Sequence, residues 1–156
     1  MSRRASVLFV CLGNICRSPL AEAAFRAEAE RRGLDVEVDS AGTGDWHVGE
    51  PPDPRARALA RAKGLPIDDL RARQLAEEDF YRFTHIFALD EQNLEGIRAR
   101  APAGVACRIG LLLDLVPGRE GEAVADPYFG EEAGFEVTWA DVSAAARAFA
   151  ERLERE

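Results

Sequence analysis

The sequence has few of the residues that covalent cross-links and metal sites require. It contains three cysteines and two histidines in 156 residues. An odd number of cysteines in a chain of this size argues against the disulfide framework of a small secreted domain. The histidines, His47 and His85, form no recognisable zinc-ligand spacing. We therefore expect neither a structural disulfide nor a metal site.

Long hydrophobic runs and an excess of positive charge are also missing. No apolar run approaches the length that spans a bilayer. The short apolar run near the N-terminus breaks at Gly13 and Asn14, so it indicates a strand and not a signal peptide. The net charge of −8 argues against nucleic acid as a partner, because such binding draws on Lys and Arg. We expect a cytoplasmic protein that binds neither membranes nor nucleic acid.

What is present fits a single domain over residues 1–156, with 47% hydrophobic residues and no repeat or linker. Patterns typical of strands alternate with patterns typical of helices. Strands are expected at residues 6–10, 36–40, 85–89 and 105–109, and helices at 19–31, 54–63, 76–82, 91–99 and 135–153. This alternation predicts an α/β fold: a three-layer, doubly wound sandwich with a central four-stranded parallel sheet and helices on both faces.

In such a sheet, ligands bind at the carboxyl ends of the strands, near a topological switch point. The turn after the first strand reads CLGNICRS, from Cys11 to Ser18. Ser18 and Pro19 suit the N-cap and the first position of a helix. Gly13 and Asn14 tolerate left-handed backbone angles. The turn can therefore present a concave set of N–H groups at a helix N-terminus, which suits a tetrahedral oxyanion.

The side chains of this turn add chemistry to the anion site. The helix dipole, the N–H groups and Arg17 all favour Cys11 as a thiolate. Arg17 can also fork onto two oxygens of a bound phosphate. A thiolate beneath that phosphate lies in line to attack phosphorus, which predicts phosphoryl transfer to Cys11 followed by hydrolysis.

Other interpretations of the turn fit less well. Cys11 and Cys16 could be core residues, but packing alone does not call for Asn14, Arg17 and Ser18. Their spacing begins one iron–sulfur pattern, whose next ligand would fall where Pro19 stands. The Gly-Lys-Ser/Thr of nucleotide-binding loops is absent, and the GTGDWH stretch lacks the third glycine of a dinucleotide fingerprint. We expect no cofactor.

The stretch VCLGNICRSPLAEA resembles the phosphate-binding loop of the low-molecular-weight protein tyrosine phosphatases. Four further blocks match that family in the right order: DSAGTGDWHVGEPPDPRA, RARQL, ALDEQNL and DPYFG. The resemblance therefore covers nearly the whole chain. It implies a phosphatase that acts on tyrosine-phosphorylated proteins or peptides and holds phosphate or another oxyanion in its active site.

The resemblance also implies a role for individual residues. Cys11 would be the nucleophile, Arg17 the transition-state clamp and Asp126 the general acid. The phosphate-binding loop would comprise Leu12, Gly13, Asn14, Ile15, Cys16, Arg17 and Ser18. Within it, Ser18 would donate to the thiolate.

Further matching positions would support the loop or line the entrance. Asn14 and Ser40 would hydrogen-bond to hold the backbone of the loop, and Asp90 would be a buried carboxylate nearby. Ile15, Trp46, Tyr128 and Phe129 would wall the substrate pocket, where aromatic rings can stack against a phenyl ring. Hydrophobic neighbours would favour the protonated form of Asp126.

Two departures from the family pattern stand out. Leu70 occupies the place of a histidine that supports the asparagine–serine pair in relatives, so we expect a thinner network here. Phe129 replaces a tyrosine and removes a hydroxyl.

Cys16 matches the cysteine that, in the family, traps the oxidised nucleophile as a reversible disulfide, although it is also a plausible small packing residue. Cys107 is expected in the core, within the fourth strand.

Related loops serve other proteins on this fold. Protein arginine phosphatases resemble the sequence closely but tend to carry Thr where Ile15 stands, and Ile15 leaves the pocket wall apolar. Thiol-linked arsenate reductases need two further cysteines after the third strand, which this chain lacks. A phosphate-binding or redox-sensing module without turnover would not need Asp126.

Overall fold

The structure, a computed structural model, describes residues 4–128, 130 and 133–156. One all-parallel sheet contains four strands in the order β2-β1-β3-β4. The strands are β1 (Ser6–Cys11), β2 (Glu37–Gly42), β3 (His85–Ala88) and β4 (Arg108–Leu111). The predicted α/β fold with a four-stranded parallel sheet is confirmed.

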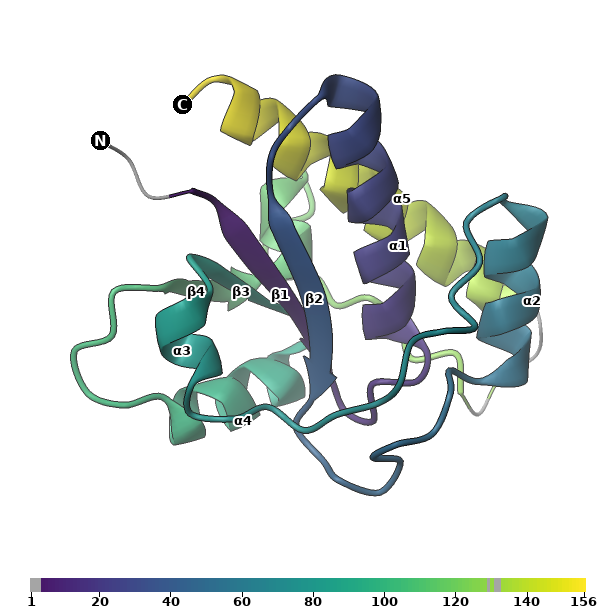
Figure 1. Ribbon diagram of the computed structural model, residues 1–156, viewed down its shortest axis with the longest axis horizontal. Helices are drawn as coiled ribbons and strands as arrows, with labels where there is room; N and C mark the ends of the chain where they lie inside the picture. The colour runs from purple at the N-terminus through teal and green to yellow at the C-terminus, as the bar shows by residue number, and fades with distance from the viewer. Residues whose placement is uncertain (1–3, 129, 131–132) are drawn as a thin grey trace.

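Helices cover both faces of the sheet (Figure 1). On one face lie α1 (Arg17–Arg32), α2 (Pro54–Ala62) and α5 (Ala133–Glu154), and on the other lie α3 (Asp79–Arg82) and α4 (Glu91–Arg100). A short 3₁₀ helix, η1 (Leu112–Leu115), follows β4. None of the described helices combines the length and apolar character needed to cross a membrane.

Alternation along β1 supplies both halves of the core. Val7 and Phe9 point into the cluster beneath α1 and α5, while Leu8 and Val10 point into the cluster beneath α3 and α4. All six residues of β1 are buried, as expected for a central strand covered on both faces. The strand that ends at Cys11 is therefore held rigidly from both sides.

The carboxyl end of β1 lies at the switch point of the sheet. β2 pairs with one edge of β1 and β3 pairs with the other, so the strands that follow β1 in the sequence lie on opposite sides of it. Cys11 is the last residue of β1 and pairs with Gly42 at the end of β2. The turn at residues 11–18, called here the phosphate loop, starts at the position where ligands bind in such sheets.

The start of α1 differs from the prediction. The helix begins at Arg17 with Cys16 at the N-cap position, and no side chain caps it. Ser18 lies inside the first turn because its hydroxyl bonds to groups of the phosphate loop instead. The first N–H groups of α1 are thus left for an anion.

Two further boundaries also move. β4 begins at Arg108, three residues later than predicted, because its register pairs Arg108 with His85 at the start of β3. Cys107 therefore precedes the strand and is only half-buried, although it packs against the second core cluster. The short helix before β3 covers residues 79–82, the last part of the predicted segment.

Candidate active site

Cys11 lies at the floor of the phosphate loop. It is 3% exposed, and its sulfur is 3.0 Å from the Ser18 hydroxyl. The backbone N–H of Asn14 donates to the same sulfur over 3.3 Å. The sulfur is thus held by two polar groups of the loop at the N-terminus of α1.

Asn14 holds the loop above this sulfur. Its backbone φ of 59° is left-handed, a conformation that asparagine adopts more readily than other side chains. The Asn14 amide nitrogen donates to the hydroxyls of Ser18 (2.8 Å) and Ser40 (3.0 Å), and its oxygen accepts from the backbone N–H of Arg73 (3.0 Å). The structure thus brings Asn14 and Ser40 together.

This network extends to Glu22, a residue that was not predicted to belong to the site. The Ser40 hydroxyl donates to Glu22 Oε1 over 2.7 Å, and Arg26 lies 3.0 Å from Glu22 Oε2. Burial raises the pKa of Glu22, although its bond from Ser40 opposes the shift. Leu70 packs against the core, and a carboxylate–arginine pair supports Ser40. That the network is thinner than in relatives with a histidine at this position stays a prediction. The signal available in the sequence was a glutamate amid the small apolar residues of the first helix.

Arg17 reaches into the site from the first turn of α1. Its Nη1 donates to Asp90 Oδ2 (2.8 Å) and to the Val124 carbonyl (3.0 Å). Burial alone would lower the pKa of Arg17, but the charge of Cys11 and the bond to Asp90 raise it. The side chain is 3% exposed and remains a fixed positive charge.

Asp90 serves both the site and the adjacent helix. Besides accepting from Arg17, its Oδ1 caps α4 by accepting from the Asn93 N–H over 2.7 Å. Its side chain is 23% exposed, so it is partly exposed rather than buried as predicted. The cap lies at a helix start, where a carboxylate is stabilising.

Cys16 is the second cysteine of the phosphate loop. Burial, and then the negative charges of Asp53 and Cys11, raise the pKa of the Cys16 thiol well above its ordinary value. It is 4% exposed and remains a neutral thiol. Cys16 is therefore a buried thiol that stays protonated at the base of the loop.

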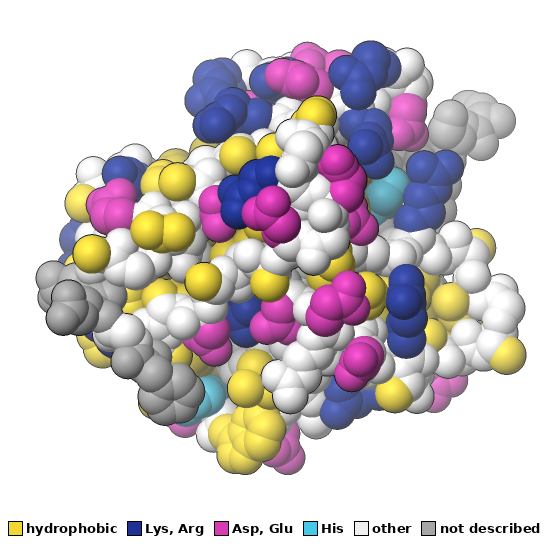
Figure 2. All heavy atoms as spheres, turned by 180° about the vertical axis from the view of Figure 1, so that it is seen from behind, with side chains coloured by type: hydrophobic (Ala, Val, Ile, Leu, Met, Phe, Trp, Pro, Cys, Tyr) yellow, Lys and Arg dark blue, Asp and Glu magenta, His cyan; other side chains and the backbone are white. Residues whose placement is uncertain are grey.

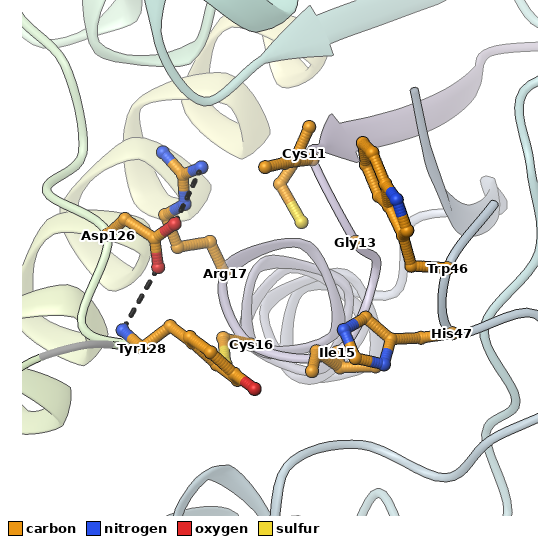
Figure 3. Close-up of a pocket in the computed structure, with 10 residues that line it drawn as sticks. Cys11, Gly13, Ile15, Cys16, Arg17, Trp46, His47, Asp126 and Tyr128 are labelled. Carbon is orange, nitrogen blue, oxygen red and sulfur yellow. Dashed lines mark hydrogen bonds and ion pairs between the residues drawn. The ribbon is translucent and has the colours of Figure 1, made fainter. Parts of the chain in front are cut away.

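The phosphate loop forms the base of a cavity of about 220 Å³. In Figure 3, the Cys11 sulfur points into it, with Arg17 and Asp126 on one side and Trp46 and His47 on the other. The complete lining is Cys11, Leu12, Gly13, Ile15, Cys16, Arg17, Trp46, His47, Asp126 and Tyr128.

Asp126 faces the sulfur across this cavity. Its Oδ2 is 3.6 Å from Arg17 Nη2, and its Oδ1 accepts from the Tyr128 N–H over 3.0 Å. The side chain is 38% exposed. Asp126 therefore places a partly exposed carboxylate on the wall of the cavity, beside Arg17.

Aromatic side chains form the rim. Trp46 is 68% exposed, and its ring lies over Gly44, where a Cβ would be only 1.9 Å away. Tyr128 faces His47 with ring centroids 6.3 Å apart. Figure 2 shows a group of hydrophobic side chains at the lower edge, where the strands of Figure 1 end, and a mixture of hydrophobic side chains and charges of both signs over the rest of that face.

His47 lines the cavity and was missed as a site residue in the sequence. Its Nδ1 is 3.3 Å from Glu50. The signal that the sequence offered for His47 was the adjacent tryptophan in a turn-rich loop.

Phe129, predicted to belong to the pocket wall, lies outside the described residues. Within the described residues, no group of three or more His, Cys, Asp or Glu is arranged to hold a metal ion.

The chain matches a family model and known proteins over most of its length. The family model "Low molecular weight phosphotyrosine protein phosphatase" matches residues 6–156. A protein of that name from Schizosaccharomyces pombe is 44% identical over 138 residues, covering 86% of this chain and 88% of the relative.

Solved structures of the same fold include two phosphatases that are named for different substrates. A protein tyrosine phosphatase from Entamoeba histolytica, with Hepes in its active site, has a TM-score of 0.91 at 34% identity and 97% coverage of both chains. A Drosophila arginine phosphatase has a TM-score of 0.88 at 36% identity, covering 95% of this chain and 97% of its own. The chain belongs to the low molecular weight phosphotyrosine protein phosphatase family.

Proposed function

We propose that this phosphatase hydrolyses phosphotyrosine in proteins or peptides through a phosphocysteine intermediate on Cys11. The observation that carries the proposal is the Cys11 sulfur, held at the cavity floor by Ser18 and the Asn14 N–H, with Arg17 beside it. In the first step the sulfur attacks phosphorus. An S–P bond forms as the bond to the phenolic oxygen breaks.

Asp126 supplies the proton for the departing oxygen and is thereby left as a carboxylate. In the second step a water molecule attacks the phosphocysteine and gives its proton to Asp126. The S–P bond breaks, which releases phosphate and restores the thiolate. Acid–base help of this kind typically speeds a step by about 10²–10⁴-fold.

Arg17 and the N–H groups of the loop stabilise the charge on the transferring phosphoryl group. Asp90 and the Val124 carbonyl fix one arm of the guanidinium. The arginine therefore needs little reorganisation when phosphate enters, which is the condition for strong electrostatic stabilisation.

The depth of the cavity and its aromatic rim favour an aryl phosphate. Trp46 and Tyr128 offer faces for a phenyl ring, and Ile15 keeps the wall apolar. A phosphoserine is too short to bring its phosphate to the buried Cys11 while its backbone stays outside.

Phosphoarginine is the second candidate substrate. The similarity to the Drosophila arginine phosphatase favours it, whereas apolar Ile15 favours the phenyl ring. Side-by-side assays on matched phosphotyrosine and phosphoarginine peptides discriminate the two. We expect the larger kcat/KM for phosphotyrosine.

Cys16 fits a protective role in this scheme. Peroxide would oxidise the Cys11 thiolate to a sulfenic acid. The Cys16 thiol would then condense with it, forming a disulfide and releasing water. In Cys16→Ser, further peroxide would oxidise the unprotected sulfenic acid to irreversible acids, so thiol treatment after excess peroxide should restore less activity in the variant than in the native enzyme.

The variant Cys11→Ser tests the proposal as a whole. Its turnover of aryl phosphates should fall by at least about 10⁴-fold, as expected when a covalent nucleophile is lost. Its affinity for inorganic phosphate should remain, because Arg17 and the loop are untouched. Retained turnover would contradict the proposal.

A further inference from the structure

Arg55, in the first turn of α2, contacts the loop that carries Asp126. Its Nη2 donates to the Tyr128 carbonyl over 2.8 Å, and its Nη1 donates to the Gly130 carbonyl over 3.1 Å. We call the described part of this segment, residues 126–128 and 130, the acid loop. Arg55 thus joins α2 to two backbone positions just beyond the general acid.

The same guanidinium is anchored on Asp53. Arg55 Nε lies 3.1 Å from Asp53 Oδ1, and Nη2 lies 3.1 Å from Oδ2. The Asp53 side chain is 8% exposed. Burial alone would raise the pKa of Asp53, but the hydrogen bonds from Arg55 lower it. Asp53 therefore remains an anion at neutral pH and fixes the arginine in place.

Asp53 in turn is tied to the phosphate loop. Its backbone N–H donates to the Ile15 carbonyl over 2.8 Å, and its carboxylate caps α2 through the Arg55 N–H at 2.8 Å. A continuous path of hydrogen bonds therefore runs from the phosphate loop through Asp53 and Arg55 to the acid loop.

Ring contacts hold the plane of the guanidinium. It lies over the Phe135 ring of α5 at 4.7 Å and over the Tyr128 ring at 5.8 Å. Both its charge and its planar fork are used here, so lysine is a poor substitute. Arg55 is not among the described residues that line the cavity, and it reaches the acid loop through the backbone carbonyls of residues 128 and 130.

We propose that Arg55 is a positioning residue for proton transfer to the leaving group. It holds the acid loop in register with the phosphate loop, so that Asp126 stays within hydrogen-bond reach of the departing oxygen. This inference rests on the proposed function, since it concerns the step that Asp126 performs. A misplacement of about 1 Å can cost about 10²-fold in rate.

The test compares two leaving groups in Arg55→Met, which keeps much of the stem and removes the donors. For phenyl phosphate, whose leaving group is poor, kcat/KM should fall by about 10-fold or more. For 4-nitrophenyl phosphate the loss should be several-fold smaller, because this phenol leaves without much help. Inhibition by inorganic phosphate should be unchanged, because the phosphate loop keeps its own contacts.

Arg57→Met is the matched control. Arg57 lies on the same helix and also donates to a backbone carbonyl, that of Pro52, over 2.9 Å. Both substrates should be turned over at native rates. Arg55→Lys, which retains the charge but not the fork, should show the same selective loss to a smaller degree. If Arg55→Met fails to fold, the comparison of the two leaving groups is made with Arg55→Lys instead.

The background Asp126→Ala separates this inference from the function itself. In that background Arg55→Met should add little further loss for phenyl phosphate, because the group it positions is gone. Equal slowing of both substrates, full additivity with Asp126→Ala, or a native substrate ratio in Arg55→Lys would overturn the inference alone. If Asp126→Ala slowed both substrates equally, the acid assignment would fail and the inference with it.

Discussion

Asn14 combines backbone strain and hydrogen bonding at a single position. It is the one residue other than glycine with positive φ among the described residues. Its side chain binds Ser18, Ser40 and the Arg73 N–H. These two properties can be separated by mutation.

Asn14→Ala and Asn14→Gly both remove the three side-chain hydrogen bonds. Both should reduce activity and lower the free energy of unfolding by about 1–3 kcal/mol, because buried partners lose their bonds. Asn14→Ala should lower the free energy of unfolding by about 1 kcal/mol more than Asn14→Gly does, because only glycine adopts this φ without strain. Urea unfolding and phosphatase assays measure both effects. Equal stability of the two variants would contradict the strain argument.

At the same scale, residue identity in the sequence predicted part of the site well. The turn CLGNICRS indicated an anion site with Cys11 beneath it, because strand, glycine, helix start and arginine occur within a few residues. Glu22, His47 and Arg55 were not predicted. Their roles depend on which surface each helix or loop turns toward the site, and single-residue chemistry carries little information about that.

At the scale of elements, the end of β2 supports the phosphate loop by close backbone contact. A Cβ added at Gly42 would lie 2.7 Å from the Leu12 carbonyl oxygen and 3.1 Å from the Gly13 carbonyl carbon. Both atoms belong to backbone that cannot rotate away. The strand therefore requires glycine where it passes beneath the loop.

Gly42→Ala should displace the phosphate loop. We expect a loss of about 1–3 kcal/mol in stability, typical of overpacking, together with weaker phosphate binding. Gly110→Ala in β4 is the control, because an added Cβ there has no neighbouring atom within 4 Å. Thermal unfolding and phosphate inhibition distinguish the two. Native phosphate affinity in Gly42→Ala would be inconsistent with the contact described.

β3 carries a buried histidine that links stability to pH. The His85 ring packs against Phe149 and Phe87 with centroids 5.0 and 6.0 Å away, and its Nε2 has no partner among the described residues. Burial, and then the charge of Arg108, lower the pKa of His85 from its ordinary 6.5. As the pH falls, the unfolded chain therefore takes up a proton at His85 before the folded chain does.

It follows that the contribution of His85 to stability falls as the pH drops below about 6.5. His85→Phe keeps the aromatic packing and removes the titrating group. The difference in unfolding free energy between the variant and the native protein should grow in favour of the variant between pH 7.5 and pH 5. A pH-independent difference would show that His85 does not titrate between these limits.

Element boundaries show which parts of the fold the sequence could predict. β1 and β3 were predicted to within one residue, because long or dense apolar runs mark central strands. β4 and α1 were displaced. The start of β4 depends on its register with β3, and that of α1 depends on Ser18 bonding to Cys11 instead of capping. Both are tertiary effects.

For the molecule as a whole, the fold brings the positive end of α1, the buried guanidinium of Arg17 and the acid loop to one edge of the sheet. In the proposed mechanism the helix end and Arg17 stabilise the charge of the transferring phosphoryl group, which other phosphatases do with metal ions, and the acid loop protonates the leaving group. Adding EDTA should therefore leave activity on aryl phosphates unchanged. A strict requirement for an added divalent ion would contradict the scheme.

The central claim is that phosphate passes through a covalent bond to Cys11, and trapping that bond tests it most directly. The enzyme would be mixed with 4-nitrophenyl phosphate, quenched in acid within the first turnovers and digested for mass spectrometry. We predict that the peptide containing Cys11 gains the mass of one phosphoryl group, and that Cys16→Ser behaves in the same way. A burst of nitrophenol with no phosphoryl group on Cys11, or with the group on another residue, would contradict the account.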